Sequence, residues 1–184
     1  MTGWSCNRSR SALPLQNKHS DSIGLRPVRR DDVDALLALD RACFRPGIAY
    51  SRAELQYFLF HARSVSVLAE DEDGIAGFAI VKFHFEKGLC VGHIITIDVA
   101  EAQRRRGVGR LLMDALLASC HQAEATLLRL EVAVDNAGAI AFYERLGFTE
   151  TGRIPGYYMG KLDALTMGLA VQADAPPAPP QNNR

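Results

Sequence analysis

Glycine and arginine are concentrated at residues 103–110, Q-R-R-R-G-V-G-R, and these residue types can hold a phosphate group. Gly107 and Gly109 let the backbone approach a ligand closely, because neither residue carries a Cβ atom. The arginines add charged donors that match phosphate oxygens. A helix that begins here contributes unpaired N–H groups and the positive end of its dipole. The same pattern also fits an ordinary solvated turn, so the flanking segments decide between the two.

The flanking segments predict a strand before this turn and a helix after it. Residues 92–99 are rich in β-branched side chains and short enough for a strand. Downstream, apolar residues recur on one helix face at Val108, Leu111, Leu112, Ala115 and Leu116. The unit is not a P-loop, since no Gly-Lys-Ser/Thr follows, and it lacks the third glycine of the dinucleotide fingerprint. We therefore interpret it as a strand, a phosphate-binding turn and a helix.

The composition predicts one folded domain between two tails. The chain has 184 residues, of which 48% are hydrophobic, so it can bury one core. We expect the domain over residues 23–171, a disordered polar tail over 1–22 and a disordered Ala/Pro-rich tail over 172–184. The formal net charge of zero argues against general nucleic-acid binding. No apolar run approaches the roughly 20 residues that cross a bilayer, so no membrane partner is expected.

The cysteines and histidines predict neither a disulfide framework nor a metal site. Four cysteines without paired spacing are typical of a reducing, cytoplasmic protein. Cys90 and His93 are three residues apart, but no second ligand pair accompanies them. Cys120 and His121 are adjacent at a helix end, where neighbouring side chains point apart, which argues against a covalent cysteine mechanism.

Periodicity and turn residues predict alternating strands and helices around the glycine turn. Helices are expected after Asp31 as a cap, after the capping box of Ser51 with Glu54, and from Asn136 to a left-handed stop at Gly147. Strands are expected at residues 25–29, 65–69, 75–85, 92–99, 125–134, 148–152 and 165–171.

Two connecting segments carry further expectations. The acidic residues 70–73 lack the alternating ligand spacing of a calcium loop, so we interpret them as a solvated hairpin turn. The loop 45–50 ends at Tyr50, an aromatic residue without an obvious packing partner. We expect this loop to border a binding site.

Glu131 and Tyr143 are the candidate acid–base groups. Glu131 lies on the less apolar face of its strand, where it either forms an ion pair with Arg129 or a neighbouring group, or faces a cleft. Tyr143 shares a helix face with Ile140 and Leu146, and by default it is a half-buried core aromatic whose hydroxyl is satisfied.

Five segments together resemble the acetyl-CoA-binding core of the GNAT N-acetyltransferases. They are residues 97–99 (IDV), 104–109 (RRRGVG), 130–132 (LEV), 136–140 (NAGAI) and 142–148 (FYERLGF). Their order and spacing are most similar to the ribosomal-protein-alanine (RimI-type) N-terminal acetyltransferases. The resemblance implies an α/β (α+β) GNAT fold. Its mixed sheet has six to seven strands flanked by about four helices and is splayed between the two central parallel strands.

The resemblance also implies the co-substrate and the catalytic roles. In that family the pantetheine arm of acetyl-CoA lies in the gap between the splayed strands. Glu131 is then the general base, directly or through water, and Tyr143 protonates the leaving thiolate. A bulged strand near Val99 is expected to offer a backbone N–H to the reacting oxygen. The implied cofactor-binding residues are Ile97, Asp98, Val99, Arg104, Arg105, Arg106, Gly107, Val108, Gly109, Arg110 and Asn136.

The implied acceptor is the α-amine of a protein or peptide N-terminus, with a ribosomal protein among the candidates. Tyr50, Tyr157 and Tyr158 are the expected substrate-binding residues. An α-amine titrates about 2.5 units below a lysine amine, so its neutral form costs about 3.4 kcal/mol less to present. The alternatives are acetylation of a small amine, such as a polyamine or antibiotic, and a non-catalytic acetyl-CoA-binding regulatory domain. A monomer or weak homodimer is expected.

Overall fold

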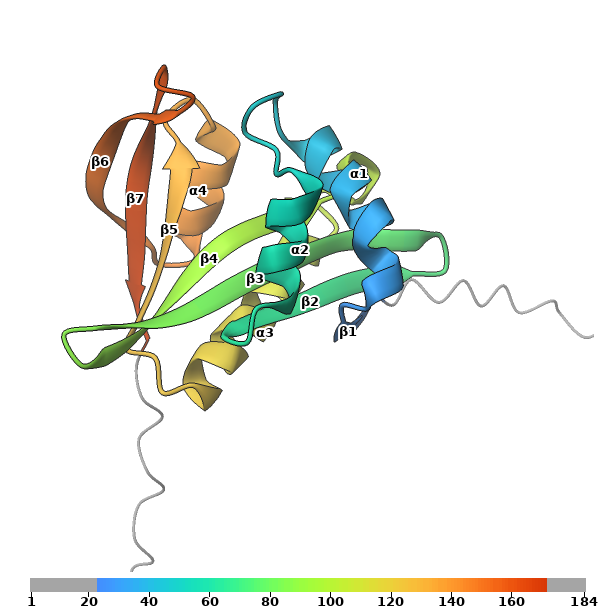
Figure 1. Ribbon diagram of the computed structural model, residues 1–184, viewed down its shortest axis with the longest axis horizontal. Coiled ribbons are helices and arrows are strands. Elements are labelled where there is room, and N and C mark those ends of the chain that lie inside the picture. The colour runs from blue at the N-terminus through green and yellow to red at the C-terminus, as the bar shows by residue number, and fades with distance from the viewer. Residues whose placement is uncertain (1–22, 172–184) are drawn as a thin grey trace, which may run out of the picture.

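The computed structural model describes residues 23–171, which form one seven-stranded sheet with helices on both faces (Figure 1). The tails expected at residues 1–22 and 172–184 lie outside the described residues. The helices are α1 (Val33–Cys43), α2 (Arg52–Phe60), α3 (Val108–Gln122) and α4 (Ala137–Arg145), with 3₁₀ turns at Arg30–Asp32 and Glu101–Gln103. The strands are β1 (Gly24–Pro27), β2 (Ser64–Asp71), β3 (Gly74–Glu86), β4 (Leu89–Val99), β5 (Leu127–Ala133), β6 (Thr149–Tyr158) and β7 (Leu162–Ala170).

The strand order β1-β2-β3-β4-β5-β7-β6 confirms the predicted mixed sheet. Its parallel neighbours are β4 and β5, and the other adjacent pairs are antiparallel. A parallel pair needs a long crossover, and α3 supplies it between β4 and β5. The glycine turn therefore lies at the end of β4, where the chain leaves the sheet to form α3.

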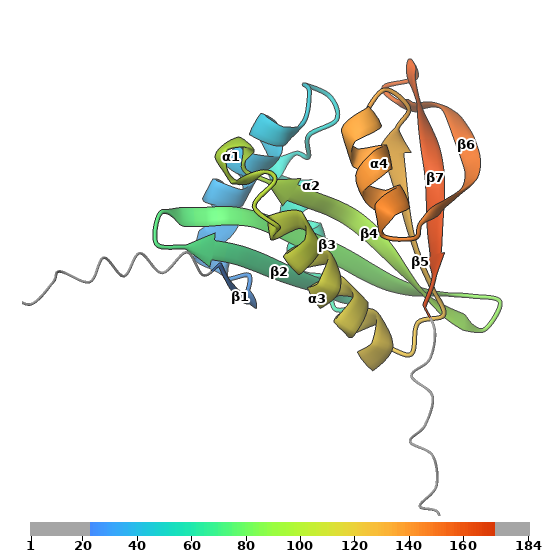
Figure 2. The same ribbon diagram turned by 180° about the vertical axis from the view of Figure 1, so that it is seen from behind.

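Two apolar clusters hold the helices on the sheet. Helices α1 and α2 cover one face through Leu36 and Leu55, which are fully buried beside Phe78 of β3. Helices α3 and α4 cover the other face, as Figure 2 shows. On α3 the buried stripe includes Met113 and Cys120, which the predicted apolar face did not contain. Leu111 and Ala115 of the predicted face are only partly buried, so the stripe is shifted toward Met113.

The sheet opens between β4 and β5. Register pairs join them at three positions, the last of which is His93 with Arg129. Beyond this point β5 continues beside β7, while the two parallel strands diverge toward their carboxyl ends (Figure 1). The predicted splay is confirmed, and it leaves the edge of β4 beyond His93 without β5 as a partner.

A β-bulge places the side chains of β4 on this opened stretch. Ile94 pairs with Val81 of β3, and Thr96 pairs with the preceding residue of β3, so Ile95 is the extra residue. The bulge expected near Val99 therefore lies four residues earlier than predicted. The hydrophobic period of β4 could not locate it, because isoleucines occupy both neighbouring positions.

The bulge decides which face Asp98 occupies. Ile94 and Ile97 pack in the cluster beneath α3, whereas Ile95 packs with the cluster beneath α1 and α2. Asp98 is close enough to Asp40 of α1 for that carboxylate to raise its pKa. An unbroken strand cannot place residues three apart on one face, because its side chains alternate with a period of two. The extra residue turns Asp98 toward α1 and away from α3.

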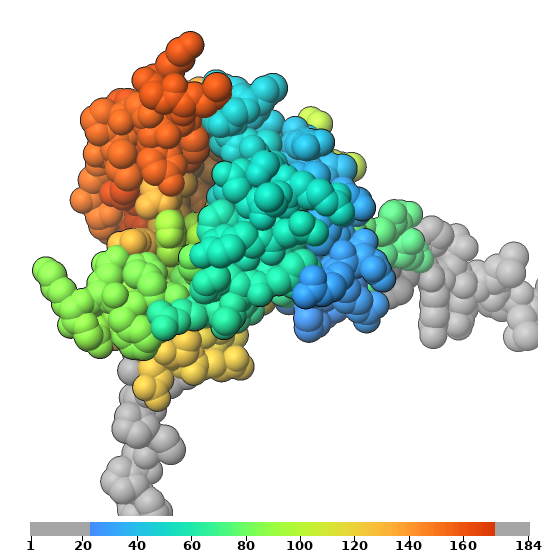
Figure 3. Space-filling model, in the orientation of Figure 1, coloured from blue at the N-terminus to red at the C-terminus, as the bar shows by residue number. Residues whose placement is uncertain are grey.

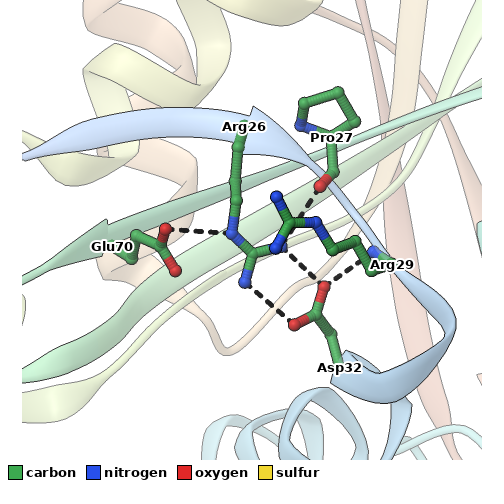
Figure 4. Close-up of polar contacts among 5 residues, drawn as sticks. All are labelled: Arg26, Pro27, Arg29, Asp32 and Glu70. Carbon is green, nitrogen blue, oxygen red and sulfur yellow. Dashed lines mark hydrogen bonds and ion pairs between the residues drawn. The ribbon is translucent and has the colours of Figure 1, made fainter.

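Arg26 fastens the edge strand β1 to β2 and to the start of α1 (Figure 4). Its guanidinium donates to both oxygens of Asp32 at 2.7 and 2.9 Å, and its Nε donates to Glu70 at 2.9 Å. Asp32 also accepts the backbone N–H of Arg29 at 2.6 Å. The pairing with Arg26 lowers the pKa of Asp32. Asp31 was the expected cap of α1 and is wrong, because the N-cap residue is Asp32, whose side chain bonds to Arg26 and Arg29 and makes no capping bond to α1.

The other predicted helix ends are confirmed. Ser51 accepts the N–H of Glu54 at 3.3 Å while Glu54 accepts the N–H of Ser51 at 2.9 Å, which completes the capping box of α2. Asn136 accepts the N–H of Ala139 at 3.1 Å at the start of α4, and Gly147 has a left-handed φ of 90° after its end. Within residues 23–171, no helix has the length and apolar character of a membrane span.

We expect Ser51→Ala to lower the free energy of unfolding by about 1 kcal/mol, because the first turn of α2 loses its side-chain acceptor. Urea denaturation followed by circular dichroism measures this change. Ser119→Ala is the matched control, since the Ser119 hydroxyl bonds to the Ala115 carbonyl within α3 and caps nothing. Equal losses in the two variants would contradict the capping role.

Candidate active site

A cavity of about 550 Å³ lies where β4 and β5 separate. Its walls come from the opened stretch of β4, the end of β5, the start of α4, the loop before α2 and the β6–β7 hairpin. The predicted residues that line it are Tyr50, Ile97, Glu131, Asn136, Tyr143, Tyr157 and Tyr158. The structure thus brings together both candidate acid–base groups and all three candidate acceptor-binding tyrosines.

Glu131 faces the cavity and is paired with a histidine. Its Oε2 lies 2.5 Å from Nε2 of His93 on β4, and both side chains are mostly buried. The expected pair with Arg129 is wrong, because Arg129 instead contacts Glu86 at 2.6 Å. Arg129 and Glu131 are two residues apart on β5. Arg129 contacts Glu86 at the end of β3, whereas Glu131 contacts His93 on β4. Glu131 thus pairs with a neighbouring group, His93, and also faces the cavity, so only the expected partner Arg129 is wrong.

His93 is the functional residue that sequence reasoning missed. The sequence suggests only a metal-ligand role for His93, beside Cys90, and that spacing does not indicate a partner for it. Its partner depends on the register between two parallel strands that are separated by a helix, and His93 is the last residue of β4 to pair with β5. One signal was available: His93 lies on the strand that was expected to be the parallel neighbour of the strand that carries Glu131.

Tyr143 lies across the cavity from the acidic pair as part of an aromatic cluster. Its ring is 9% exposed and packs edge-on against Phe142 and Phe148, with centroid distances of 5.3 and 5.6 Å. Burial raises the pKa of its hydroxyl, and the nearby carboxyl of Asp98 adds to this effect. Tyr143 also lines the cavity, which agrees with the expectation that it is largely buried in the core.

Tyr50 is held rigidly on the cavity wall. Its hydroxyl donates to the Ile95 carbonyl at 3.1 Å, beside the bulge of β4, and its backbone N–H donates to Asp40 at 2.8 Å. Its ring meets Phe58 of α2 edge-on at 5.4 Å. The expectation that Tyr50 lacked a packing partner is therefore wrong, whereas its loop borders the cavity as predicted.

The roof of the cavity joins segments that are far apart in sequence. Gly47, in the loop before α2, approaches Met159 of the β6–β7 hairpin so closely that a Cβ atom on Gly47 would overlap the Met159 sulfur. Arg45 of the same loop pairs with Asp135 before α4 at 2.8 Å. Figure 3 shows this loop and the hairpin meeting at the top of the molecule. These two contacts hold the loop against the hairpin and the start of α4 at one side of the cavity.

The glycine turn offers unpaired donors at the start of α3. Gly107 has a φ of 88°, which explains its identity, because the space around its Cβ position is open. Gly109 instead lies against the ring of Phe142, at 3.4 Å from its Cβ position. No described side chain caps α3, and its first hydrogen bond runs from the Leu111 N–H to the Gly107 carbonyl at 3.0 Å. The preceding N–H groups are free for an anion, which is the arrangement that a diphosphate fits.

The arginines around this turn point in different directions. Arg104 donates to the Val99 carbonyl at 3.4 Å, Arg110 pairs with Asp114 at 2.8 Å, and Arg106 reaches Asp71 at 3.4 Å. Arg105 has a positive φ of 62° and is exposed. The cluster predicted as one set of phosphate ligands is thus divided, with part of its charge engaged by the protein.

Asp98 contributes a buried carboxyl behind the cavity wall. It is fully buried, accepts the hydroxyl of Thr96, and has one oxygen without a partner among the described residues. Burial raises its pKa to about 8, and it raises the pKa of Asp40 to about 6. Burial therefore favours the protonated form of Asp98. The side chain faces α1, so only its backbone remains a candidate for the cofactor contact.

Comparison with known proteins agrees with this geometry. Residues 33–148 match the sequence profile of the Acetyltransferase (GNAT) family. N-alpha-acetyltransferase 30 of Schizosaccharomyces pombe is 33% identical over 116 residues, which cover 62% of this chain and 77% of that protein. The ribosomal protein bS18-alanine N-acetyltransferase of Salmonella typhimurium is 35% identical over 103 residues, which cover 54% and 67%. Arabidopsis thaliana NAA60, crystallised in complex with acetyl-CoA, superposes with a TM-score of 0.73 at 22% identity over 82% of this chain and 99% of that one.

A splayed sheet with an anion-binding helix start beside an acid–base cavity is the arrangement of an acyltransferase. The chain belongs to the GNAT family of acetyltransferases. The free N–H groups at the start of α3 fit a diphosphate ligand.

We expect Asp98→Asn to change how stability depends on pH. The folded-state pKa of Asp98 lies above its ordinary value, so between about pH 4 and 8 the folded protein holds a proton that the unfolded chain has lost. The free energy of unfolding of the wild type therefore falls as pH rises through this window, by up to about 1.4 kcal/mol per pH unit from this group. Asp98→Asn lacks that slope.

Thermal unfolding from pH 4.5 to 9 tests this expectation. The stability of Asp98→Asn relative to the wild type should increase with pH and level off above about pH 8. Asp31→Asn removes a carboxylate from an exposed position and should run parallel to the wild type. Parallel curves for Asp98→Asn would show that Asp98 is ionised in the folded protein.

Proposed function

We propose that the protein transfers the acetyl group of acetyl-CoA to the α-amine of a protein or peptide N-terminus. The observation that carries the proposal is the single cavity, in which the Glu131–His93 pair and the Tyr143 hydroxyl face a space bordered by Tyr50, Tyr157 and Tyr158. The names of the two sequence relatives, an N-alpha-acetyltransferase and a ribosomal-protein-alanine acetyltransferase, support this acceptor class. A ribosomal protein is accordingly among the acceptor candidates.

The binding residues follow from the shape of the opened sheet. The N–H groups of Val108, Gly109 and Arg110 would hold the diphosphate, with Arg104 and Arg105 adding charge at its edge. The backbone of residues 97–99 would hold the pantetheine arm, because β5 does not pair with β4 there. Asn136 lines the cavity and uses its carbonyl oxygen to cap α4, so its amide N–H₂ is left for the cofactor arm.

The chain's own residues then move two protons. When bound, acetyl-CoA supplies the acetyl group as a thioester, whose carbon bonds to the acceptor nitrogen as its bond to sulfur breaks. Glu131 takes the proton that the acceptor nitrogen gives up, and the contact of 2.5 Å lets His93 share it. The Tyr143 hydroxyl donates a proton to the departing sulfur. Burial favours the protonated phenol, so the proton is in place when the sulfur leaves.

The acceptor class follows from proton affinity and from the shape of the site. An α-amine is deprotonated at a cost about 3.4 kcal/mol lower than a lysine amine, which one carboxylate shared with an imidazole can meet. Tyr50 from the loop before α2 and Tyr157 and Tyr158 from the β6–β7 hairpin line the space in which the acceptor would lie. We further infer a cytoplasmic protein that acts as a monomer or weak homodimer, without a nucleic-acid or membrane partner.

We expect Glu131→Gln to lower kcat about 10²-fold while the Kd of acetyl-CoA changes less than threefold, because the substitution removes a proton acceptor and keeps the shape. His93→Gln should lose less, since Glu131 remains as the base. Glu150→Gln, on an exposed part of β6, is the matched control. Steady-state kinetics with calorimetry of cofactor binding measures both quantities. Unchanged turnover in Glu131→Gln would remove this residue from the mechanism.

We expect Tyr143→Phe to lower kcat at least about tenfold and to leave acetyl-CoA affinity and the unfolding temperature nearly unchanged. Only the hydroxyl is lost, and the ring keeps its contacts with Phe142 and Phe148. The loss should shrink with acyl donors whose thiol leaving group is more acidic, because such a thiolate leaves without a proton. A loss independent of the leaving group would contradict proton donation by Tyr143.

The acceptor class is tested by mass spectrometry after incubation with acetyl-CoA. We expect acetylation at the α-amine of unmodified peptides and none at lysine side chains of peptides whose α-amine is blocked. A panel of polyamines and aminoglycosides serves as the comparison. Turnover of those amines together with failure of every peptide would replace the proposed acceptor by a small molecule.

A further inference from the structure

The acidic hairpin turn between β2 and β3 is built into the phosphate-binding turn. The Asp71 side chain is only 5% exposed, so the expectation of a solvated acidic turn is wrong for this residue. Its Oδ1 accepts the N–H of Asp73 at 3.0 Å, which shapes the hairpin turn itself. Its Oδ2 accepts the side-chain amide of Gln103 at 3.2 Å and faces the Arg106 guanidinium at 3.4 Å. Gln103 in turn accepts a hydrogen bond from Arg106.

These contacts tie both ends of residues 103–106 to a rigid part of the sheet. Gln103 closes the 3₁₀ turn after β4, and Arg106 immediately precedes the left-handed Gly107. Between them Arg105 also has a positive φ, a conformation that residues other than glycine adopt at a cost. The backbone is further fixed by the Ala100 N–H, which donates to the Ala76 carbonyl of β3 at 3.0 Å. These contacts therefore hold the turn against β2 and β3 before any ligand binds.

We propose that Asp71 is a positioning residue for acetyl-CoA binding. Through Gln103 and Arg106 it holds the turn in the conformation that directs the free N–H groups of α3 outward. Arg106 then has a structural role within the turn, whereas the sequence predicted that it binds phosphate. The proposal deepens the function proposed above, because it rests on the diphosphate lying at the start of α3.

Charge alone predicts the opposite effect on cofactor affinity, so a measurement of that affinity distinguishes the two explanations. A carboxylate near an anionic ligand repels it, so removing that charge should tighten binding if electrostatics dominated. Asp71 is paired with Arg106, however, and the pair contributes little net charge at the ligand. Loss of the carboxylate instead releases Gln103 and Arg106, and the ligand must then order the turn at its own entropic cost.

The experiment measures cofactor binding by isothermal titration calorimetry, with acetyl-CoA and with CoA as probes and no acceptor present. We expect Asp71→Asn to raise both Kd values about tenfold. Asp71→Glu should recover part of the loss, because it restores the charge with a longer reach. Asp73→Asn is the matched control, since it removes an exposed carboxylate from the same hairpin and should leave Kd unchanged or slightly lower. Gln103→Ala, which alters no charge, should weaken binding in the same direction.

Kinetics and a double-mutant cycle separate positioning from a general structural role. In Asp71→Asn the KM of acetyl-CoA should rise, while kcat at saturation and the KM of the acceptor stay within twofold of the wild type. Arg106→Gln should reproduce this loss, and the double variant should lose no more than either single one. Unchanged or tighter cofactor binding in Asp71→Asn would overturn the proposal, as would equal losses in all kinetic constants. Binding without an acceptor does not depend on which amine is acetylated, so failure of the proposed acceptor would leave this result intact.

Discussion

The structure depends on the separation of β4 from β5 after three paired residues. An interior strand normally has both edges hydrogen-bonded, and an unpaired edge inside a protein is costly unless another group satisfies it. Here the opened edge of β4 borders a cavity, and the helix that follows β4 begins with free N–H groups. One geometric event therefore creates a backbone surface for an extended ligand, an anion site at its end and a space for a second substrate.

Three acidic residues lie in three different environments. Glu131 faces the opened space and contacts His93 on the neighbouring strand. Asp98 is turned by the bulge into the dry layer beneath α1, where burial beside Asp40 favours its neutral form. Asp71 lies at the far end of the sheet and is neutralised by Arg106. The three side chains carry the same carboxyl group. The role of each one follows from whether water, a base or a guanidinium reaches it.

The local features of the sequence predicted much of the fold, because they depend on short-range chemistry. The capping box of Ser51 with Glu54 involves residues three apart, and the left-handed Gly147 follows from backbone sterics alone. The bulge at Ile95 escaped prediction because hydrophobic side chains suit both faces of a strand that is buried on both sides. Asp31 was the predicted cap of α1, but the helix begins after Asp32, whose side chain bonds to Arg26 on the edge strand, a contact that no local pattern indicates.

The sequence by itself determined the order of elements, the glycine turn before α3 and the residue types at the site, since periodicity, turn chemistry and five short segments were sufficient for these. Only the tertiary structure decided which groups act on one another. Glu131 and His93 are separated by 38 positions, and Asp71 and Arg106 by 35. Such pairs depend on strand register and on the path of a crossover helix. A register shift of one residue sends a side chain to the opposite face of the sheet, and no local pattern in this chain fixes that shift.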